Sequence, residues 1–136
     1  MLFRSTPFEA GLTFTIAWDK DGGFIGREAL LIHKAKGTPR KRLVQVCLED
    51  DSDSAPLMYH EEPILKDGQI VGSIRSGAFG HRIQKSIGMG YVGCESGVTR
   101  EWLADGVWEV EVACRRYRAR VQLEPLYDPK NERIKA

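Results

Sequence analysis

The stretch that decides the fold is Gly68–Val92, which reads GQIVGSIRSGAFGHRIQKSIGMGYV. Glycine recurs there at positions 68, 72, 77, 80, 88 and 90, which favours turns and close backbone approach over a helix. The pattern predicts a strand that breaks at Ser76-Gly77, a polar loop over Arg75–Lys85, and a second strand that begins at Ser86. We therefore expect a β element whose loop is available for specificity.

Short strands are predicted on both sides of this stretch. Asp67-Gly68 is a strong two-residue hairpin signal, and Leu43–Leu48 is rich in β-branched residues. A second hairpin is expected from Trp108–Val112 to Tyr117–Leu123, with a turn near Arg115-Arg116. Alternation along its last strand places arginines on one face and smaller or apolar residues on the other: Arg116, Arg118 and Arg120 against Tyr117, Ala119 and Val121.

The N-terminal part has a different pattern. Leu12, Phe14, Ile16 and Trp18 alternate with period two, which predicts a strand over Phe8–Trp18. A helix is expected from about Gly26 to Lys36, with Gly37 as its C-cap and Pro39 preventing its continuation. The predicted fold is thus mainly β: a small antiparallel Greek-key-like β-barrel preceded by a short strand-helix unit.

One strand-helix unit cannot bury both of its faces by itself. We therefore expect residues 1–37 to be the tail of a preceding domain, and residues 38–136 to form a C-terminal antiparallel β-barrel domain.

Composition limits the function classes. The chain has 136 residues and a formal net charge of +1, which argues against general nucleic-acid affinity. No apolar run approaches the length of a membrane span, and the start of the chain lacks the features of a secretory signal. Cys47, Cys94 and Cys114 show neither a disulfide framework nor metal-knuckle spacing, so we expect buried or half-buried thiols in a reducing compartment, the cytoplasm.

The sequence gives no catalytic or metal-ligating constellation. No nucleophile-base pair, metal-ligand spacing or phosphate-binding loop is present, and the Asp19–Gly23 turn lacks the oxygen ligands of a calcium loop. His33 is expected to be a surface or edge residue, and His81 a solvent-exposed loop residue. The basic run that ends at Arg42 and the acidic run Glu49–Asp53 are expected to be a solvated linker and a loop.

Three segments together resemble a known family. They are Lys85–Val92 (KSIGMGYV), the pair EAGL at 9–12 and GFIGREAL at 23–30, and the tail PLYDPKNERI at 125–134. They resemble the C-terminal barrel region of the glycine-cleavage T-protein (aminomethyltransferase) family, which includes the folate-binding parts of dimethylglycine and sarcosine dehydrogenases. The tail favours the dehydrogenase branch. Gly80-His81 departs from the Ser-Pro that T-proteins commonly carry in this loop.

The resemblance implies a folate-related role. In the family, a one-carbon unit derived from a methylated amine passes to tetrahydrofolate and yields 5,10-methylenetetrahydrofolate. Glu9 would hold the pterin, and Arg42, or less surely Arg40, would bind the carboxylate tail. From the residues alone, Glu9 can equally be an exposed residue at the start of a strand, and both arginines can belong to a solvated linker.

The family's catalytic aspartate, and an FAD domain if one is present, would lie upstream of this chain, so the chain alone is expected to be inactive. The expected partners are folate, the one-carbon unit and preceding domains of the same protein, with neither nucleic acid nor membrane. Two alternatives stay open: a non-catalytic β-barrel interaction module that docks through the basic last hairpin, and part of a stand-alone T-protein, which would need a lipoyl carrier.

Overall fold

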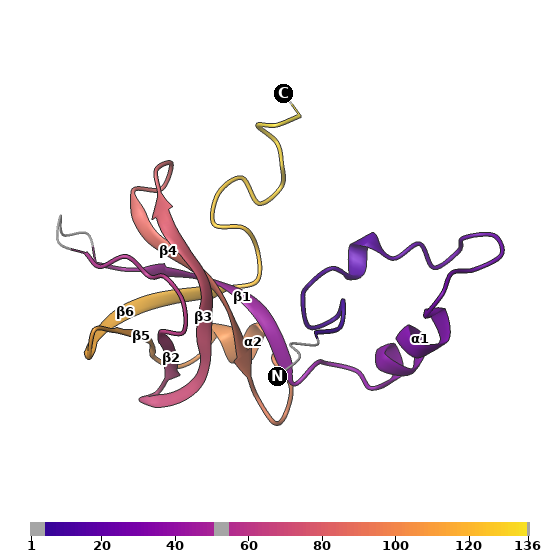
Figure 1. Cartoon of the computed structure of the whole chain (residues 1–136), viewed down its shortest axis with the longest axis horizontal. Helices are drawn as coiled ribbons and strands as arrows, with labels where there is room; N and C mark the ends of the chain where they lie inside the picture. Colours follow the sequence, from indigo (N-terminus) through magenta and orange to yellow (C-terminus); the bar gives the residue numbers. More distant parts are fainter. Residues whose placement is uncertain (1–4, 51–54, 136) are drawn as a thin grey trace.

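A computed structural model describes residues 5–50 and 55–135. Six antiparallel strands close into a barrel in the order β1-β4-β3-β2-β5-β6 (Figure 1). Because β2, β3 and β4 form a meander and β1 lies beside β4, the order is that of a Greek key. The predicted fold class is confirmed. The strands are β1 (Lys41–Leu48), β2 (Pro63–Lys66), β3 (Gln69–Gly80), β4 (Lys85–Gly93), β5 (Trp108–Val112) and β6 (Arg115–Gln122).

The loop predicted over Arg75–Lys85 is wrong in extent, because β3 runs on to Gly80 and only a four-residue turn separates it from β4. Gly77 does not break the strand. A Cβ at this position would lie 1.9 Å from the Met58 carbonyl oxygen, so glycine lets the segment before β2 cross directly over β3. Met58 then reaches the barrel core and is fully buried.

The barrel interior is apolar and continuous. Val44, Val46, Ile64, Ile74 and Val110 are at most 1% exposed, and they come from β1, β2, β3 and β5. The short helix α2 (Arg100–Ala104) contributes buried Leu103 to the same core. Among the described residues, none of positions 5–40 belongs to this cluster.

The buried side chain of Lys66 and its partner Asp67 link the β2–β3 turn to the loop before β5. Lys66 is 8% exposed, and its ammonium lies 5.5 and 5.8 Å from the ring centroids of Trp102 and Trp108. Its ammonium is 3.1 Å from an Asp67 carboxylate oxygen. The other Asp67 oxygen accepts a hydrogen bond of 2.8 Å from the Val107 backbone N–H. A charge at this depth is therefore paired, as burial requires.

The last hairpin turns two residues earlier than predicted. Ala113 and Cys114 form the turn, both with positive φ (49° and 61°), as a type I′ hairpin turn requires. Neither residue type signals such a turn, which explains the error. Cys114 is consequently exposed, contrary to expectation, whereas Cys47 is buried and Cys94 is intermediate. The predicted faces of β6 are confirmed: its arginines are exposed, and Ala119 and Val121 are buried.

Residues 5–40 form an arm beside the barrel, here called the N-terminal arm (right-hand side of Figure 1). Helix α1 (Arg27–Ala35) is present as predicted, followed by Gly37 with φ +79°. The strand predicted over Phe8–Trp18 is wrong. That segment contains turns and a 3-10 helix, Thr13–Thr15, because every barrel strand already has two neighbours and none is left to pair with it.

Backbone hydrogen bonds attach the arm to the barrel at its two ends. The Leu43 N–H donates to the Glu9 carbonyl at 2.7 Å, and the Cys94 N–H donates to the Arg40 carbonyl at 2.8 Å. The Val98 N–H donates to Pro39 at 2.9 Å. These bonds fix the turn that contains Glu9 next to the linker that joins α1 to β1. Of the acidic run, positions 51–54 lie outside the described residues.

Candidate functional site

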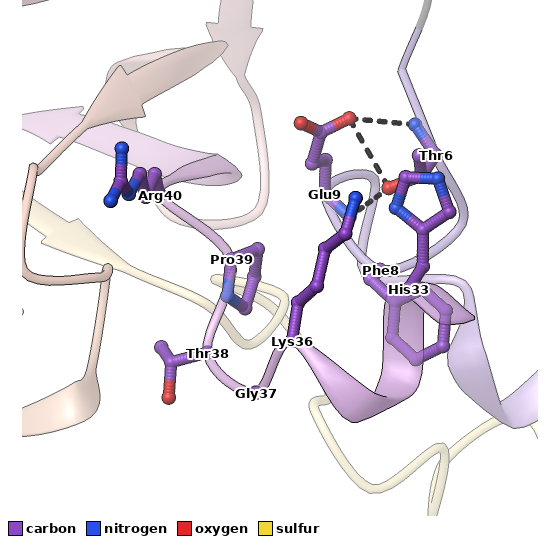
Figure 2. A pocket seen from close by; sticks show the side chains of 9 residues that line it. All are labelled: Thr6, Phe8, Glu9, His33, Lys36, Gly37, Thr38, Pro39 and Arg40. Carbon is purple, nitrogen blue, oxygen red and sulfur yellow. Dashed lines mark hydrogen bonds between the residues drawn. The ribbon is translucent and has the colours of Figure 1, made fainter. Parts of the chain in front are cut away.

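A hollow of about 490 Å³ lies where the arm joins the barrel, between the Glu9 turn and the linker after α1. We call it the linker pocket. Figure 2 shows Glu9 and Arg40 on opposite sides of it, with Lys36 and Pro39 between them. Its size falls within the range typical of small-molecule sites, about 300–1,000 Å³. The residues that line it are Thr6, Phe8, Glu9, His33, Lys36, Gly37, Thr38, Pro39 and Arg40.

Glu9 is held in this pocket by its own turn. Its Oε2 accepts hydrogen bonds from the Thr6 N–H at 2.7 Å and the Thr6 hydroxyl at 3.2 Å, and the Glu9 N–H donates back to that hydroxyl at 3.3 Å. Thr6-Pro7-Phe8-Glu9 thus has the hydrogen-bond pattern of a capping box, here in a turn over residues 7–11 rather than in a helix. The sequence contains this signal, although the period-two pattern led us to predict a strand instead.

The capping box narrows what Glu9 can offer a ligand. One oxygen is committed to Thr6, whereas Oε1 accepts no hydrogen bond from any described residue. Figure 2 shows this second oxygen directed into the pocket, toward the side where Arg40 lies. Glu9 can therefore accept a hydrogen bond from a ligand through Oε1, while Thr6 fixes the orientation of the carboxylate.

Arg40 lines the opposite side of the pocket and already has a partner. Its Nη1 lies 3.4 Å from a Glu95 carboxylate oxygen, and its side chain is 77% exposed. An ion pair this exposed is weak, so Arg40 can exchange Glu95 for a ligand carboxylate. The structure thus brings two of the three predicted folate-binding residues, Glu9 and Arg40, to one pocket.

Arg42 lies elsewhere. It lines a separate hollow of about 410 Å³, between residues 10–14 of the arm and the segment after β6. Its Nε is buried and has no hydrogen-bond partner among the described residues. Arg100 is ion-paired with Glu124 in the same hollow. The hydrogen bond from Arg100, together with the charges of Arg100 and Arg42, lowers the pKa of the Glu124 carboxyl, so this cluster is already partly neutralised.

Sequence reasoning missed two side chains of the linker pocket. Lys36 and His33 lie on its α1 side (Figure 2). Their spacing of three residues places both on one face of a helix end, and this was the available signal. What the spacing could not supply was the opposite side of the pocket, because it depends on the path of the chain through residues 5–11. His33 is half-buried, which fits the predicted surface or edge position, and His81 is exposed as predicted.

Other candidate features of the described chain offer weaker grounds for a functional site. In the described part of the chain, no group of three or more His, Cys, Asp and Glu side chains is placed to hold a metal ion, and no helix there is long and apolar enough to cross a membrane. The arginine face of β6 is partly compensated by β5. Glu111 lies 3.4 Å from Arg116, and Glu109 lies directly opposite Arg118.

Comparisons with known proteins agree with this architecture. Over 86% of its length, the chain superposes on 30% of the crystal structure of glycine cleavage system aminomethyltransferase T from Bartonella henselae, with a TM-score of 0.67 and 22% identity. At this identity the likeness establishes the fold alone.

Sequence relatives are closer. The chain is 38% identical to 4-methylaminobutanoate oxidase (formaldehyde-forming) of Paenarthrobacter nicotinovorans and 38% identical to human mitochondrial sarcosine dehydrogenase, over 95% and 96% of its own length. It is 36% identical to an aminomethyltransferase of Synechocystis over 91% of its length. It spans 14% of each of the first two proteins and 31% of the third.

Residues 41–128 match the family model described as the glycine cleavage T-protein C-terminal barrel domain. The matched range begins at β1 and includes every strand of the barrel, together with the segment that follows β6. The chain therefore belongs to the family of glycine cleavage T-protein C-terminal barrel domains.

Proposed function

We propose that the chain is the C-terminal part of a folate-dependent one-carbon transfer region, and that its linker pocket completes a tetrahydrofolate site. The observation that carries this proposal is the meeting of Glu9 and Arg40 across one hollow in a chain of this family. A carboxylate and a guanidinium on opposite sides suit a ligand with an amino-heterocycle at one end and a carboxylate at the other.

The residues present fit part of a folate. Oε1 of Glu9 can accept a hydrogen bond from the pterin amino group, and Arg40 can bind a carboxylate at the rim. Arg42 faces the neighbouring hollow, so in this proposal it contacts folate only if the ligand extends past the Glu9 turn. When bound, tetrahydrofolate supplies the nitrogen acceptors for the one-carbon unit, and this chain contributes walls that exclude water from that unit.

The first test is a calorimetric titration of the chain with 5-formyltetrahydrofolate, a stable reduced folate. We expect binding that weakens at least tenfold in Glu9→Gln, because the amide presents one oxygen instead of a charged carboxylate and disturbs the bond to Thr6.

Glu28→Gln is the matched control, since Glu28 is an exposed glutamate in the first turn of α1, outside the pocket. Thermal unfolding of each variant separates loss of binding from loss of the capping box. Equal affinities for the wild-type chain and Glu9→Gln, or no binding by a folded wild-type chain, would rule out this site.

We further propose that the complete protein is of the dimethylglycine or sarcosine dehydrogenase type, with FAD held only by a preceding domain and the whole protein in the cytoplasm. The N-terminal arm would then be the end of the preceding domain, and the barrel would begin after residue 37. A stand-alone aminomethyltransferase is the alternative. The upstream sequence distinguishes them, because a dinucleotide-binding glycine fingerprint there marks the flavoprotein.

An interaction module is the second candidate, and the exposed arginines of β6 favour it. Charge reversal at Arg116 and Arg118 would abolish partner binding in that case and leave folate binding intact. The acidic residues of β5 opposite these arginines weaken this candidate.

A further inference from the structure

We propose that the hollow beside Arg42 is a second ligand site, which binds the carboxylate of a small molecule with an apolar body. We call it the Arg42 hollow; its volume is about 410 Å³, and it is separate from the linker pocket. The inference goes beyond the proposed function and does not depend on it, because Glu9 does not line this hollow and the ligand need not be a folate. The side chains that carry the argument are those of Leu12, Phe14, Arg42, Met89, Arg100 and Glu124.

The first argument is that Arg42 is half-buried without the anion that such burial calls for. Its buried Nε has no hydrogen-bond partner among the described residues. Half-buried Arg75, in contrast, is ion-paired with Glu61. The more deeply buried Lys66 is paired with Asp67. Because the Arg42 guanidinium is partly removed from water, a carboxylate that accepts its N–H groups would offset the cost of that burial.

The second argument is the balance of charge inside the Arg42 hollow. The protein carboxylate that lines it, Glu124, is ion-paired with Arg100. The hydrogen bond from Arg100 is the largest cause of the lowered pKa of Glu124, and the charge of Arg42 is the smallest. Two guanidinium groups therefore share one carboxylate, and the charge of Arg42 is left for a ligand. Glu124 would compete with that ligand for Arg100.

The third argument is the apolar character of the walls. Phe14 and Leu12 of the N-terminal arm and Met89 of β4 line the hollow, and all three side chains are exposed. A ligand body that covers them would remove apolar surface from water. Such walls suit a carboxylic acid with an aromatic or aliphatic body better than a fully hydrated anion such as phosphate.

Both sides of the hollow are held in place by hydrogen bonds across it. On the arm side, the Leu43 N–H donates to the Glu9 carbonyl at 2.7 Å. On the side that follows β6, the Leu126 N–H donates to the Gln45 side-chain oxygen at 3.2 Å. The hollow is thus formed before a ligand arrives, which lowers the entropy cost of binding.

Titration of the full chain with phenylacetate, followed through the Arg42 Nε–H signal in proton–nitrogen correlation spectra, tests the inference. Arg42→Met identifies that signal by removing it. We expect phenylacetate to shift the signal, whereas phenylacetamide, which has the same ring without the charge, should leave it in place. Backbone amide shifts of residues 10–14 and 123–125 measure the affinity. Arg42→Met should weaken phenylacetate binding about tenfold or more, because charged hydrogen bonds are lost.

Two further variants fix the position of the carboxylate. Arg40→Met removes the same charge two residues away, in the linker pocket, and should leave phenylacetate binding unchanged. Glu124→Gln frees Arg100 and should tighten the binding about threefold. Glu132→Gln is its control, because Glu132 is exposed in the C-terminal tail and lies outside the hollow. Equal affinities for Glu124→Gln and the wild-type chain, or a loss in Arg40→Met, would place the carboxylate elsewhere and overturn the inference.

The inference would also be overturned if phenylacetate left the Arg42 signal in place, or if phenylacetate and phenylacetamide bound equally well. The hollow would then be a surface that another domain covers. Competition with 5-formyltetrahydrofolate distinguishes two sources of the carboxylate: displacement of phenylacetate identifies the tail of a folate, and its absence identifies a separate small acid. Phenylacetate binding should be the same in Glu9→Gln, so failure of the proposed folate site would leave this site intact.

Discussion

The barrel and the N-terminal arm differ in how far they bury their apolar side chains. The barrel encloses a core of large apolar residues, among which Ile74 is 0% exposed. The arm has no buried residue among those described, and Phe14 and Ile25 are 83% and 105% exposed. The barrel is therefore stabilised by its own interior, whereas the arm presents apolar surface of the kind that marks an interaction face.

This difference explains where the candidate site lies. A closed barrel filled with side chains leaves no room for a ligand in its centre, so the site forms at the junction with the arm. One side of the site is the linker, whose Pro39 and Arg40 carbonyls accept hydrogen bonds from barrel-side backbone N–H groups. The other side is the capping-box turn that contains Glu9. One side is thus fixed by the core and the other by local hydrogen bonds.

The largest expected effect contrasts one isoleucine of each region. Ile74→Ala removes fully buried atoms from the core and should cost about 2–5 kcal/mol of unfolding free energy. Ile25→Ala removes solvent-exposed atoms and should change it by about 0.5 kcal/mol or less. Urea unfolding followed by tryptophan fluorescence measures both. Similar losses for the two variants would mean that the arm is packed as the barrel is, which contradicts the comparison.

The next effect concerns close backbone approach within the barrel. Gly77→Ala places a methyl group 1.9 Å from the Met58 carbonyl oxygen, whereas the nearest atom at Gly93 is 3.7 Å away. Gly77→Ala should therefore cost about 1–3 kcal/mol, as overpacking does, and Gly93→Ala should be nearly neutral. Both glycines lie in strands with ordinary φ, so backbone strain does not contribute to the difference between the two variants. Equal midpoints in urea would show that the crossing segment moves aside freely.

A smaller effect is expected at α2, the helix that contributes Leu103 to the barrel core. The Thr99 hydroxyl accepts a hydrogen bond of 3.1 Å from the Trp102 N–H at the start of α2. Thr99→Ala should cost about 1 kcal/mol, as the loss of an N-cap does. Thr13→Ala in the arm is the control, because Thr13 is exposed. The thermal unfolding midpoint should fall for Thr99→Ala alone, and an equal fall for both would refute the capping role.

The smallest effect is a dependence on pH. The hydrogen bond from the Val107 N–H, and then the one from Lys66, hold the Asp67 pKa below its ordinary value of 3.8. A carboxyl whose pKa is lower in the folded state stabilises the fold above the unfolded-state pKa, and this stabilisation is lost as pH falls through the folded-state value. Asp67→Asn should therefore flatten the fall of the unfolding midpoint below about pH 4. Parallel curves for the two proteins would refute the linkage.

The sequence predicted those elements that local patterns determine. Asp67-Gly68 marked its hairpin, the alternation along β6 separated Arg118 from Ala119, and Gly37 ended α1, because each of these signals acts within a few residues. The strand predicted over Phe8–Trp18 failed because period-two alternation states a preference, and a strand also needs a neighbouring strand to pair with. The partner is a property of the whole fold.

The candidate site could be predicted only in part. Glu9 and Arg40 came from a resemblance, and their meeting in one pocket depends on backbone bonds between the arm and β1 that no local pattern reveals. Arg42 is two residues from Arg40, yet it lines a different hollow. Strand periodicity does not relate the two side chains, because β1 begins at Lys41 and Arg40 still belongs to the linker. The place of Lys36 in the pocket could not be predicted, because it depends on the path of the chain through Gly37, which brings the end of α1 and Glu9 to the same hollow.

Hydrogen exchange of the chain, with and without 5-formyltetrahydrofolate, tests the central claim most directly, because it reports on the barrel, the arm and their junction together. Without ligand, amides of β1, β3 and β4 should be the slowest to exchange and those of the arm the fastest. With ligand, residues 6–11 and 33–40 should gain protection while the barrel strands stay unchanged. Protection that appears only on β6, or no change anywhere with the barrel folded, would contradict a folate site in the linker pocket.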